Sequence, residues 1–398
     1  MKSEWNTSAI ANICKVVTDG SHTSPKSVSH GKYMVSVKDF TPYGFDFNGC
    51  RQISFADYEK LKSSGCVPQK GDILIGKDGA RYFEDIIIYN QDEAPALLSS
   101  IAILRCDEEK VIPEYLYYLL KTPSFKKDVK DNYGSGSAIP RIILKDFKRM
   151  KVEYPSIEKQ RQIVSILHDL DAKIFNNQKV NDNLEQQAAT YFQELFINNA
   201  NPMWQISTIS DLGTVVGGST PSKTKPEYYT NNGIAWITPK DLSINKSKFI
   251  SHGENDITEL GLKNSSATVM PKDTVLFSSR APIGYIAIAS NEVTTNQGFK
   301  SVIPYSEIGT AFVYFFLKHS LPVIESAASG STFKEISGSA MKNIPAIIPD
   351  RNTLDQFNSF CAPIFAQQKI LEEQNHSLAM LRDSLLPKLM SGAIDIAS

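Results

Sequence analysis

Apolar residues recur every seven positions between residues 156 and 197. One series contains Ile163, Leu170, Asn177, Leu184 and Tyr191, and the other contains Leu167, Ile174, Asn181, Ala188 and Leu195. Two series with this step form the a and d seam of a coiled coil. At about 1.5 Å per residue, the stretch predicts a helix roughly 60 Å long. Because this length exceeds one small domain, we expect the helix to run between domains.

A second seam follows residue 353. Its members are separated by alternating steps of three and four as far as Leu378 and then drift; they are Phe357, Cys361, Ile364, Gln368, Leu371, Asn375, Leu378, Leu381, Leu385 and Leu389. Amides lie near both midpoints, at Asn177 and Asn181 in the first seam and at Gln368 and Asn375 in the second. Antiparallel helices would bring these amides together, where they satisfy one another and set the register. The alternative is that the helices are only partly buried there.

The ends of both predicted helices carry local signals. Ser156 is suited to cap the first helix, and Pro202 after an Asn-rich stretch cannot continue it. Thr353 and Gln356 match a capping box at the start of the second helix, and Gly392 fits the position after its end.

The chain repeats one plan, in which a strand-rich segment precedes a long helix. The strand-rich segments are 1–155 and 203–349, and the helical ones are 156–202 and 350–398. The clearest internal match aligns residues 136–155 with residues 330–349 without a gap. We therefore predict a duplicated chain.

Short β-branched runs alternate with turns in each strand-rich segment. They cover 33–37, 72–76, 84–89 and 99–105 in the first copy and 233–238, 274–279, 285–290 and 300–304 in the second. Helical sequence follows at 113–130 and at 309–320. Strands with local helices at one end indicate an α+β domain.

Charge and cysteine content narrow the class of protein. The 398 residues carry a net charge of −1, and the two strand-rich segments are nearly neutral, with 22 Lys and Arg against 20 Asp and Glu in the first and 12 against 11 in the second. Residues 121–151 are basic, although such a run is equally compatible with a solvated face. Five cysteines without CxxC spacing, no membrane span and no signal sequence predict a cytoplasmic protein without structural zinc.

Catalytic motifs are absent from the sequence. There is no Walker loop, no dinucleotide-binding glycine motif, no methyltransferase tetrapeptide, no GxSxG and no HExxH. The six histidines lack metal spacing, and His168 and His376 are expected to be exposed on the helices. We predict no catalytic residue and no metal site, which favours a binding or scaffolding role.

Several ordered motifs resemble those of one family across essentially the whole chain. They are the helix-forming stretch that begins at Pro155, the loop-rich 217–242, and the segments 278–289, 295–304 and 329–349. The chain resembles the specificity subunits of type I restriction-modification enzymes. The second helix keeps Gln356 but lacks the usual preceding Glu, and the first strand-rich segment matches most weakly, with 19–25 its best signal.

The resemblance implies a fold and a division of labour. Two tandem target-recognition domains, 1–155 and 203–349, would be joined and separated by two long antiparallel coiled-coil helices with a pseudo-twofold repeat. Each domain would read one half of a bipartite, asymmetric double-stranded DNA target. Modification (methylase) subunits, two by expectation, would dock on the helices, and restriction subunits would join them. This chain would bind no cofactor, because AdoMet, ATP and Mg would sit on those partners.

Polar loop residues are the candidate DNA contacts, because base edges require donors and acceptors and phosphates require cations. In the first domain they are Ser21, His22, Thr23, Lys38, Lys77, Arg81, Arg141 and Lys145; in the second they are Thr220, Ser222, Lys223, Lys225, Lys240, Arg280, Asn296, Gln297, Lys300, Thr332 and Lys334. Each is equally suited to a turn or cap. Two other functions stay open: a coiled-coil scaffold without DNA binding, and a two-domain enzyme with an unrecognised site.

Overall fold

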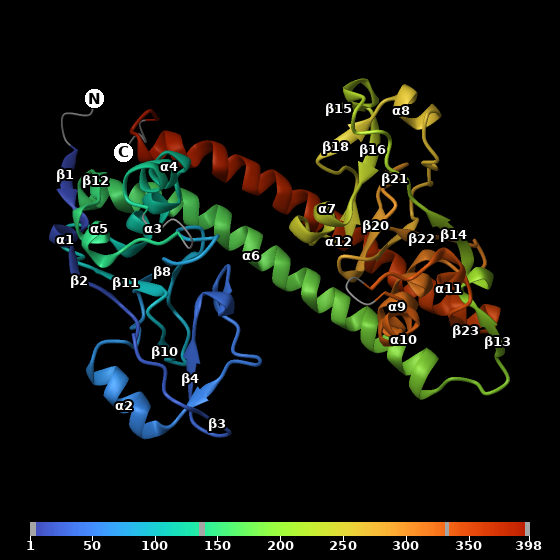
Figure 1. Cartoon of the computed structure of the whole chain (residues 1–398), viewed down its shortest axis with the longest axis horizontal. Helices are drawn as coiled ribbons and strands as arrows, with labels where there is room; N and C mark the ends of the chain where they lie inside the picture. The colour runs from blue at the N-terminus through green and yellow to red at the C-terminus, as the bar shows by residue number, and fades with distance from the viewer. Residues whose placement is uncertain (1–4, 135–139, 331–333, 395–398) are drawn as a thin grey trace. The chain divides into compact units, whose positions relative to one another are not determined.

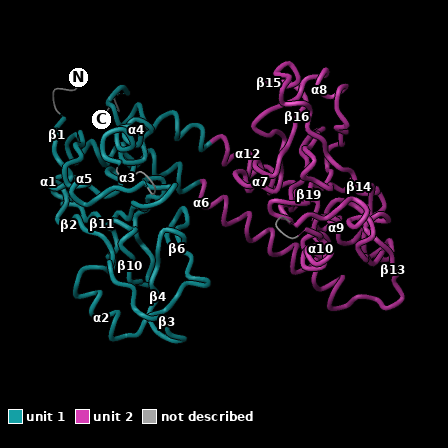
Figure 2. The backbone as a smooth tube through the Cα atoms, viewed as in Figure 1, with its two compact units in different colours: residues 1–173, 378–398 teal, residues 174–377 magenta. Residues whose placement is uncertain are grey.

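The computed structural model describes residues 5–134, 140–330 and 334–394. The chain forms two compact units, of which unit 1 contains residues 1–173 and 378–398 and unit 2 contains residues 174–377 (Figure 2). Both boundaries fall inside long helices, so each unit is built from segments far apart in the sequence. The division into four consecutive segments stays a prediction.

Two long helices dominate the chain, as the heptad pattern predicts. They are α6, Ile157–Gln193, which a π-helical turn at Glu194–Asn198 extends, and α12, Arg351–Met390 (Figure 1). In unit 1 they meet where Asp171 pairs with Arg382, and in unit 2 where the Tyr191 hydroxyl accepts a hydrogen bond from Gln356. The residue numbers rise along one helix as they fall along the other, so the helices are antiparallel.

Of the four seam amides, Asn177 and Asn375 bond to one another through their side chains, but the side-chain oxygen of Asn181 is buried without a partner among the described residues. Asn177 Nδ2 donates to Asn375 Oδ1 at 2.9 Å and to Gln374 Oε1 at 3.3 Å, while Gln368 Nε2 donates to the carbonyl oxygen of Asn181 at 3.1 Å. Asn177 and Gln368 are buried. Whether these amides set the register stays a prediction.

Two local expectations about α12 are wrong. Leu381 is 46% exposed, because the step of four after Leu378 brings Arg382 onto the facing side. The helix also begins before Thr353: Asp350 caps it, accepting from the Thr353 backbone N–H at 3.1 Å. The carboxylate thereby replaces the capping box expected at Thr353. Gly392, with φ of 69°, follows the last turn as predicted.

Unit 1 contains two four-stranded sheets and two short ribbons, one of which pairs β5 with β6. The sheets have the orders β2-β11-β8-β9 and β10-β4-β7-β3, and β1 pairs with β12. The bounds are β1 Asn6–Ala9, β2 Cys14–Asp19, β3 Ser27–Val28, β4 Lys32–Val35, β5 Phe40–Thr41, β6 Gly44–Phe45, β7 Gln52–Ile53, β8 Ile73–Gly76, β9 Ile86–Ile88, β10 Ala96–Leu97, β11 Ile101–Cys106 and β12 Lys151–Tyr154. The helices are α1 Ile10–Ile13, α2 Phe55–Ser63, α3 Pro113–Lys121, α4 Pro123–Asn132 and α5 Leu144–Arg149. The single helix expected at 113–130 is thus broken at Pro123.

Unit 2 repeats this plan. Its sheets have the orders β14-β22-β19-β20-β17 and β15-β18-β16-β21, and β13 pairs with β23. The bounds are β13 Gln205–Thr208, β14 Gly213–Gly217, β15 Tyr229–Thr230, β16 Ile234–Ile237, β17 Phe249–Ile250, β18 Asn255–Ile257, β19 Val275–Ser279, β20 Ile283–Ala289, β21 Thr294–Thr295, β22 Lys300–Pro304 and β23 Pro345–Ile348. The helices are α7 Pro239–Ile244, α8 Glu259–Lys263, α9 Thr310–His319, α10 Leu321–Ala327 and α11 Gly338–Lys342.

The two units share strand order and strand direction. Reading the second small sheet backwards gives β21-β16-β18-β15, which matches β10-β4-β7-β3 in order and in having one parallel pair at its end. The short helix before the closing strand, α5 in unit 1 and α11 in unit 2, also corresponds. The predicted duplication is therefore present in the topology.

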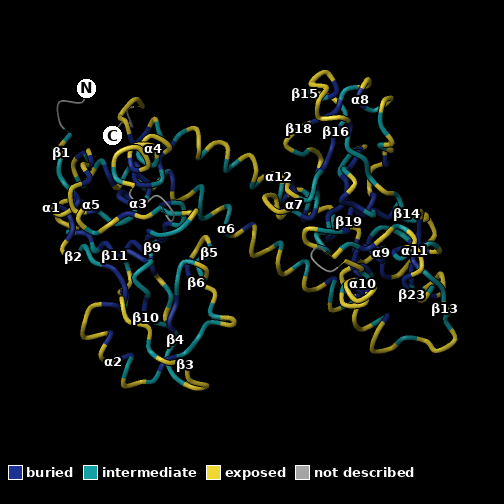
Figure 3. Tube along the Cα trace, viewed as in Figure 1, coloured by how far each residue is buried: buried dark blue, intermediate teal, exposed yellow. Residues whose placement is uncertain are grey.

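Buried residues gather along the central strands of each unit (Figure 3). The core of unit 1 includes Ile163 and Leu167 of α6 together with Leu386 and Leu389 of α12. The core of unit 2 likewise includes residues from both long helices, among them Phe192 of α6. Across the described part of the chain, every helix is too short or too polar to span a lipid bilayer.

Candidate nucleic-acid interface

Two loops of unit 2 are held together at the end of strand β14. The Ser219 backbone N–H donates to the carbonyl oxygen of Thr295 at 2.8 Å, and the Thr220 hydroxyl bonds to Gln297 Oε1. Gly218 permits this approach, since a Cβ there would lie 1.9 Å from the carbonyl oxygen of Asn296. The predicted contacts Thr220, Asn296 and Gln297 therefore lie on adjoining loops.

Three basic side chains and one carboxylate lie next to these loops. Arg280 Nη1 lies 3.2 Å from Glu335 Oε2, and Lys300 Nζ lies 3.8 Å from the other oxygen of the same carboxylate. A backbone bridge also joins Arg280 to Glu335. Lys334 is exposed beside them. One carboxylate thus faces two cations, which leaves positive charge at the surface.

The other predicted contacts of unit 2 lie elsewhere on its surface. Ser222, Lys223 and Lys225 are exposed on the loop before β15, and the Lys225 ammonium lies 5.6 Å from the ring centre of Tyr228. Lys240, at the start of α7, pairs with Glu254. Thr332 falls outside the described residues.

Unit 1 builds the corresponding loop on a buried ion pair. The Ser21 backbone N–H donates to the carbonyl oxygen of Leu97 at 2.7 Å, as Ser219 does to Thr295. Ser21 is buried and its hydroxyl holds Thr23, whereas His22 is exposed and lies 3.3 Å from Asp19. Lys77, only 7% exposed, pairs with the same aspartate at 3.3 Å. Its ammonium is therefore occupied within the chain.

The remaining predicted contacts of unit 1 are exposed. Arg81 makes two hydrogen bonds to Asp85, at 2.7 and 3.3 Å. Arg141 forms a backbone bridge with Asp78, and Lys145 follows on α5. Lys38 lies on a separate 3-10 turn, Val37–Asp39.

The same position in the two units carries opposite charges. The residue that follows Lys77, Asp78, bridges Arg141, and the residue that follows Ser279, Arg280, bridges Glu335. The backbone around them is equivalent, because the Ile142 N–H donates to Lys77 and the Ile336 N–H donates to Ser279. One scaffold therefore presents two different polar surfaces.

A family model described as the type I restriction modification DNA specificity domain matches residues 2–186 and again residues 201–375. The chain belongs to this family. Two successive matches agree with the two units of equal topology. The prediction of this family, with its fold of tandem α+β recognition domains and long helices, is confirmed.

Individual relatives agree with this assignment. The type I restriction enzyme MjaIX specificity subunit of Methanocaldococcus jannaschii is 43% identical over 162 residues, a match that spans 40% of this chain and only 37% of that protein. The HindI specificity subunit of Haemophilus influenzae is 23% identical over 408 residues, with 82% of this chain and 87% of that protein covered. The crystal structure of the type I restriction-modification S subunit from M. genitalium has a TM-score of 0.59 at 16% identity, covering 99% of this chain and 97% of that one. At this identity the last likeness shows the fold.

A buried ionic cluster attaches the second recognition unit of this specificity protein to its long helices. Lys248, 7% exposed, lies before β17 and pairs with Glu185 of α6, while Lys318 of α9 lies 2.6 Å from the same carboxylate. Lys248 Nζ also donates to Gln368 of α12 at 2.6 Å. Glu372 of α12 accepts the backbone N–H groups of Lys248 and Phe249 at 2.8 and 3.0 Å.

Burial and charge act against each other in this cluster. Burial by itself would raise the pKa of Glu185, but the charges of Lys248 and Lys318 outweigh it and the pKa is lowered. Burial lowers the pKa of Lys248, and the Glu185 carboxylate opposes that shift. Burial raises the pKa of Glu372 despite its two backbone donors. The sequence analysis missed this cluster, since no local motif distinguishes Lys248 from surface lysines.

A smaller cluster joins the same elements in unit 1. Asp171 of α6 accepts from the Tyr118 hydroxyl of α3 and from Arg382 of α12, both at 2.7 Å. Burial, and then the Asp171 charge, raise the pKa of Tyr118. Within the described residues no three His, Cys, Asp or Glu side chains gather as they would around a metal ion.

Proposed function

We propose that this chain is the DNA-specificity subunit of a type I restriction-modification complex and binds a bipartite, asymmetric double-stranded DNA target. The observation that supports it is one loop scaffold, present twice, with different polar side chains at equivalent positions. Two equal surfaces would favour a symmetric target. Two unequal surfaces on one scaffold favour two different half-sites.

The proposed recognition uses the loops at the ends of the central strands. Side chains such as Gln297 and Arg280 offer donors and acceptors to base edges, and lysines offer charge to phosphates. The helices α6 and α12, which contribute to both units, set the separation between the half-sites. In this proposal the distance between the half-sites becomes part of the specificity.

Catalysis in this proposal belongs to other subunits. Two modification subunits dock on the helices and carry AdoMet for adenine methylation, and restriction subunits that use ATP and Mg complete the assembly. This chain supplies no catalytic group and no cofactor site. The complex works in the cytoplasm, where the host DNA lies.

A map of methylated adenines in the host genome tests the proposal. Cells with the intact gene should carry methylation at one bipartite motif, and cells from which only this gene is deleted should lose that motif alone. The purified chain with its modification subunits should bind a duplex that carries the motif. Binding should weaken when bases are inserted between the two halves.

Three outcomes would contradict the proposal. An unchanged methylation map would remove the specificity role. Failure of the chain and of its complexes to bind any duplex, even at low salt where phosphate contacts are strongest, would favour a protein scaffold. Turnover of a substrate by the chain alone would favour an enzyme.

A further inference from the structure

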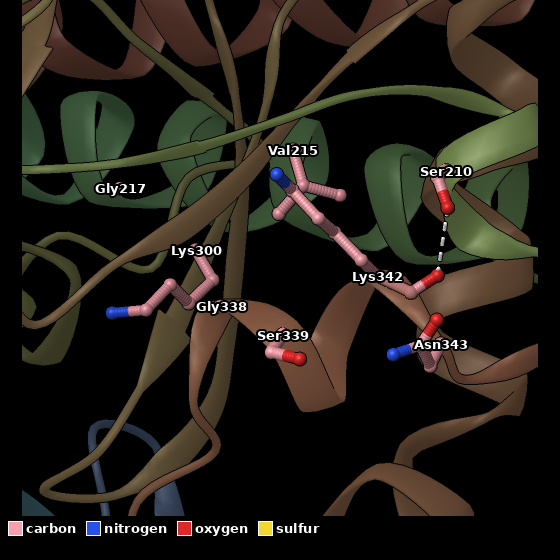
Figure 4. Close-up of a pocket in the computed structure, with 8 residues that line it drawn as sticks. All are labelled: Ser210, Val215, Gly217, Lys300, Gly338, Ser339, Lys342 and Asn343. Carbon is pink, nitrogen blue, oxygen red and sulfur yellow. Dashed lines mark hydrogen bonds between the residues drawn. The ribbon is translucent and has the colours of Figure 1, made fainter.

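A pocket of about 480 Å³ opens in unit 2 (Figure 4), and the ammonium of one lining residue, Lys300, lies 3.5 Å from the carbonyl oxygen of Gln297. Strand β14, the start of β22 and helix α11 form its walls. Lys300 and Lys342 line it together with the side chains of Ser210, Ser339 and Asn343. Among the described residues that line the pocket there are two lysines and no carboxylate.

The two lysines are in different states. Lys300 is held inside the unit, with its ammonium 3.8 Å from Glu335 and 3.5 Å from the carbonyl oxygen of Gln297. Lys342 is exposed, and among the described residues it forms no ion pair. In Figure 4 its side chain extends across the pocket to Val215. Its charge is therefore available to a ligand.

The same lysine occurs in unit 1. In the gapless match of residues 136–155 with residues 330–349, Lys148 of α5 aligns with Lys342 of α11. Ile142 and Ile336 are also identical and fully buried, and the closing prolines are identical and buried. Among the identical pairs with both members described, the lysines are the exposed pair. Packing explains the identity of the buried residues but not that of an exposed ammonium.

We propose that the pocket beside α11 binds a phosphodiester group of the DNA backbone through Lys342, and that Lys148 does the same on α5 of unit 1. The inference rests on the proposed function, because DNA is its ligand. It assigns a sequence-independent contact that both units share, whereas the loops around them differ. Such a contact positions a duplex and contributes affinity without reading its bases.

The chemistry of the pocket fits a phosphate oxygen better than a base edge. An ammonium is a compact charge on a flexible stem and lacks the planar fork with which arginine pairs with guanine. The Ser339 hydroxyl and the Asn343 amide add neutral donors around it, whereas the Ser210 hydroxyl already donates to the carbonyl oxygen of Lys342 at 3.0 Å. The pocket has free space next to Gly217, because a Cβ built there would meet no atom within 4 Å.

The salt dependence of DNA binding tests the site. The full-length chain with its modification subunits is titrated, at several salt concentrations, with a duplex carrying the methylated motif and with a scrambled duplex. Lys342→Gln should lower the affinity of the complex for both duplexes by the same factor. It should also lower the slope of log K against log salt by about 0.9, the value for one lost phosphate contact. Lys148→Gln should do the same, and the double variant should lose about twice that slope.

Lys263→Gln is the matched control, because Lys263 is an exposed lysine at the end of α8 and does not line the pocket. A slope for Lys342→Gln equal to that of the control would overturn the phosphate site while leaving the proposed function intact. A loss confined to the motif duplex would overturn it too, in favour of base reading. If the unaltered complex binds neither duplex, the proposed function fails and the site fails with it.

Discussion

Burial decides what each charged side chain of this protein can do. Lys77 and Lys248 are both 7% exposed, and each faces a carboxylate from a neighbouring element. Lys342 is exposed and faces none among the described residues. A buried ammonium without a partner is strongly destabilising, so the first two lysines are committed to the fold. The charge of Lys342 remains available to a ligand.

The two seam asparagines of α6 should respond oppositely to the same substitution. Asn177→Leu removes a donor from Asn375 and Gln374 and should lower the free energy of unfolding by about 1–2 kcal/mol. Asn181→Leu should leave it unchanged or raise it by about 1 kcal/mol, because the Asn181 side-chain oxygen is buried without a partner among the described residues. Denaturant unfolding of the full chain measures both.

A third variant checks the cause. Asn177→Leu combined with Asn375→Leu should recover most of the lost stability, since both members of the pair become apolar. If Asn177→Leu and Asn181→Leu lowered the free energy of unfolding equally, side-chain volume and not the hydrogen bond would determine the outcome.

Glu185→Gln should destabilise unit 2 in a pH-dependent manner. At neutral pH it leaves Lys248 buried without its carboxylate and should cost about 3 kcal/mol. The folded pKa of Glu185 is lowered, so its ionised form stabilises the fold above the pKa of the unfolded chain. That stability is lost as the pH falls through the lowered folded pKa. The difference in the free energy of unfolding between variant and parent should therefore disappear at acidic pH.

Glu254→Gln is the exposed counterpart, because Glu254 and Lys240 form an ion pair at the surface. Its effect on unfolding at neutral pH should stay within about 0.5 kcal/mol. A gap between the Glu185 variant and the parent that persisted unchanged in acid would contradict the assigned charge state.

Among the elements, the long helices were the most predictable from sequence, because a seven-residue period is a repeated signal. The period failed where it drifted: Leu381 is exposed, and Arg382 takes the facing position to meet Asp171. Arginine carries no apolar signal, so only the carboxylate on the other helix explains its place. The helix expected at 113–130 breaks at Thr122, directly before Pro123, because proline favours the first position of a new helix.

The N-terminus of α12 offers a test at the scale of one element. Asp350 accepts hydrogen bonds from the Thr353 backbone, the Thr353 hydroxyl and the Trp204 indole. Asp350→Ala should lower the free energy of unfolding by about 1–2 kcal/mol, as loss of a helix cap does. Asp355→Ala, which removes only an exposed pair with Arg351, should have a smaller effect. Equal effects in denaturant unfolding would argue against Asp350 as the cap.

At the scale of the whole molecule, the duplication was evident in the sequence but its reading surfaces were not. The two units share their strand order, because the buried strands keep the same hydrophobic pattern in both copies. The residues predicted to contact DNA have different environments in the structure. Thr220 and Gln297 bond to one another at the surface, whereas Lys77 is buried. Loop polarity indicates exposure only in part, since an ion pair within the chain can bury the same residue.

Substitutions in the two units should change different halves of the target. Arg280→Ala should relax base preference in one half-site and Arg141→Ala in the other, each by about 1–3 kcal/mol if the guanidinium pairs with a base. Methylated-adenine maps of strains carrying each variant provide the measurement. A single variant that altered both halves would contradict independent reading by the units.

The core of unit 1 contains residues from both ends of the chain. Leu386, Leu389 and Met390 pack with residues from the first half of the sequence, such as Ile10 and Tyr115. During synthesis the first recognition unit therefore cannot complete its core until the last turns of α12 leave the ribosome. Part of its apolar surface stays exposed until then. A premature stop before the last turns of α12 would damage the unit made first, so such a truncated product should be degraded instead of competing with the intact subunit.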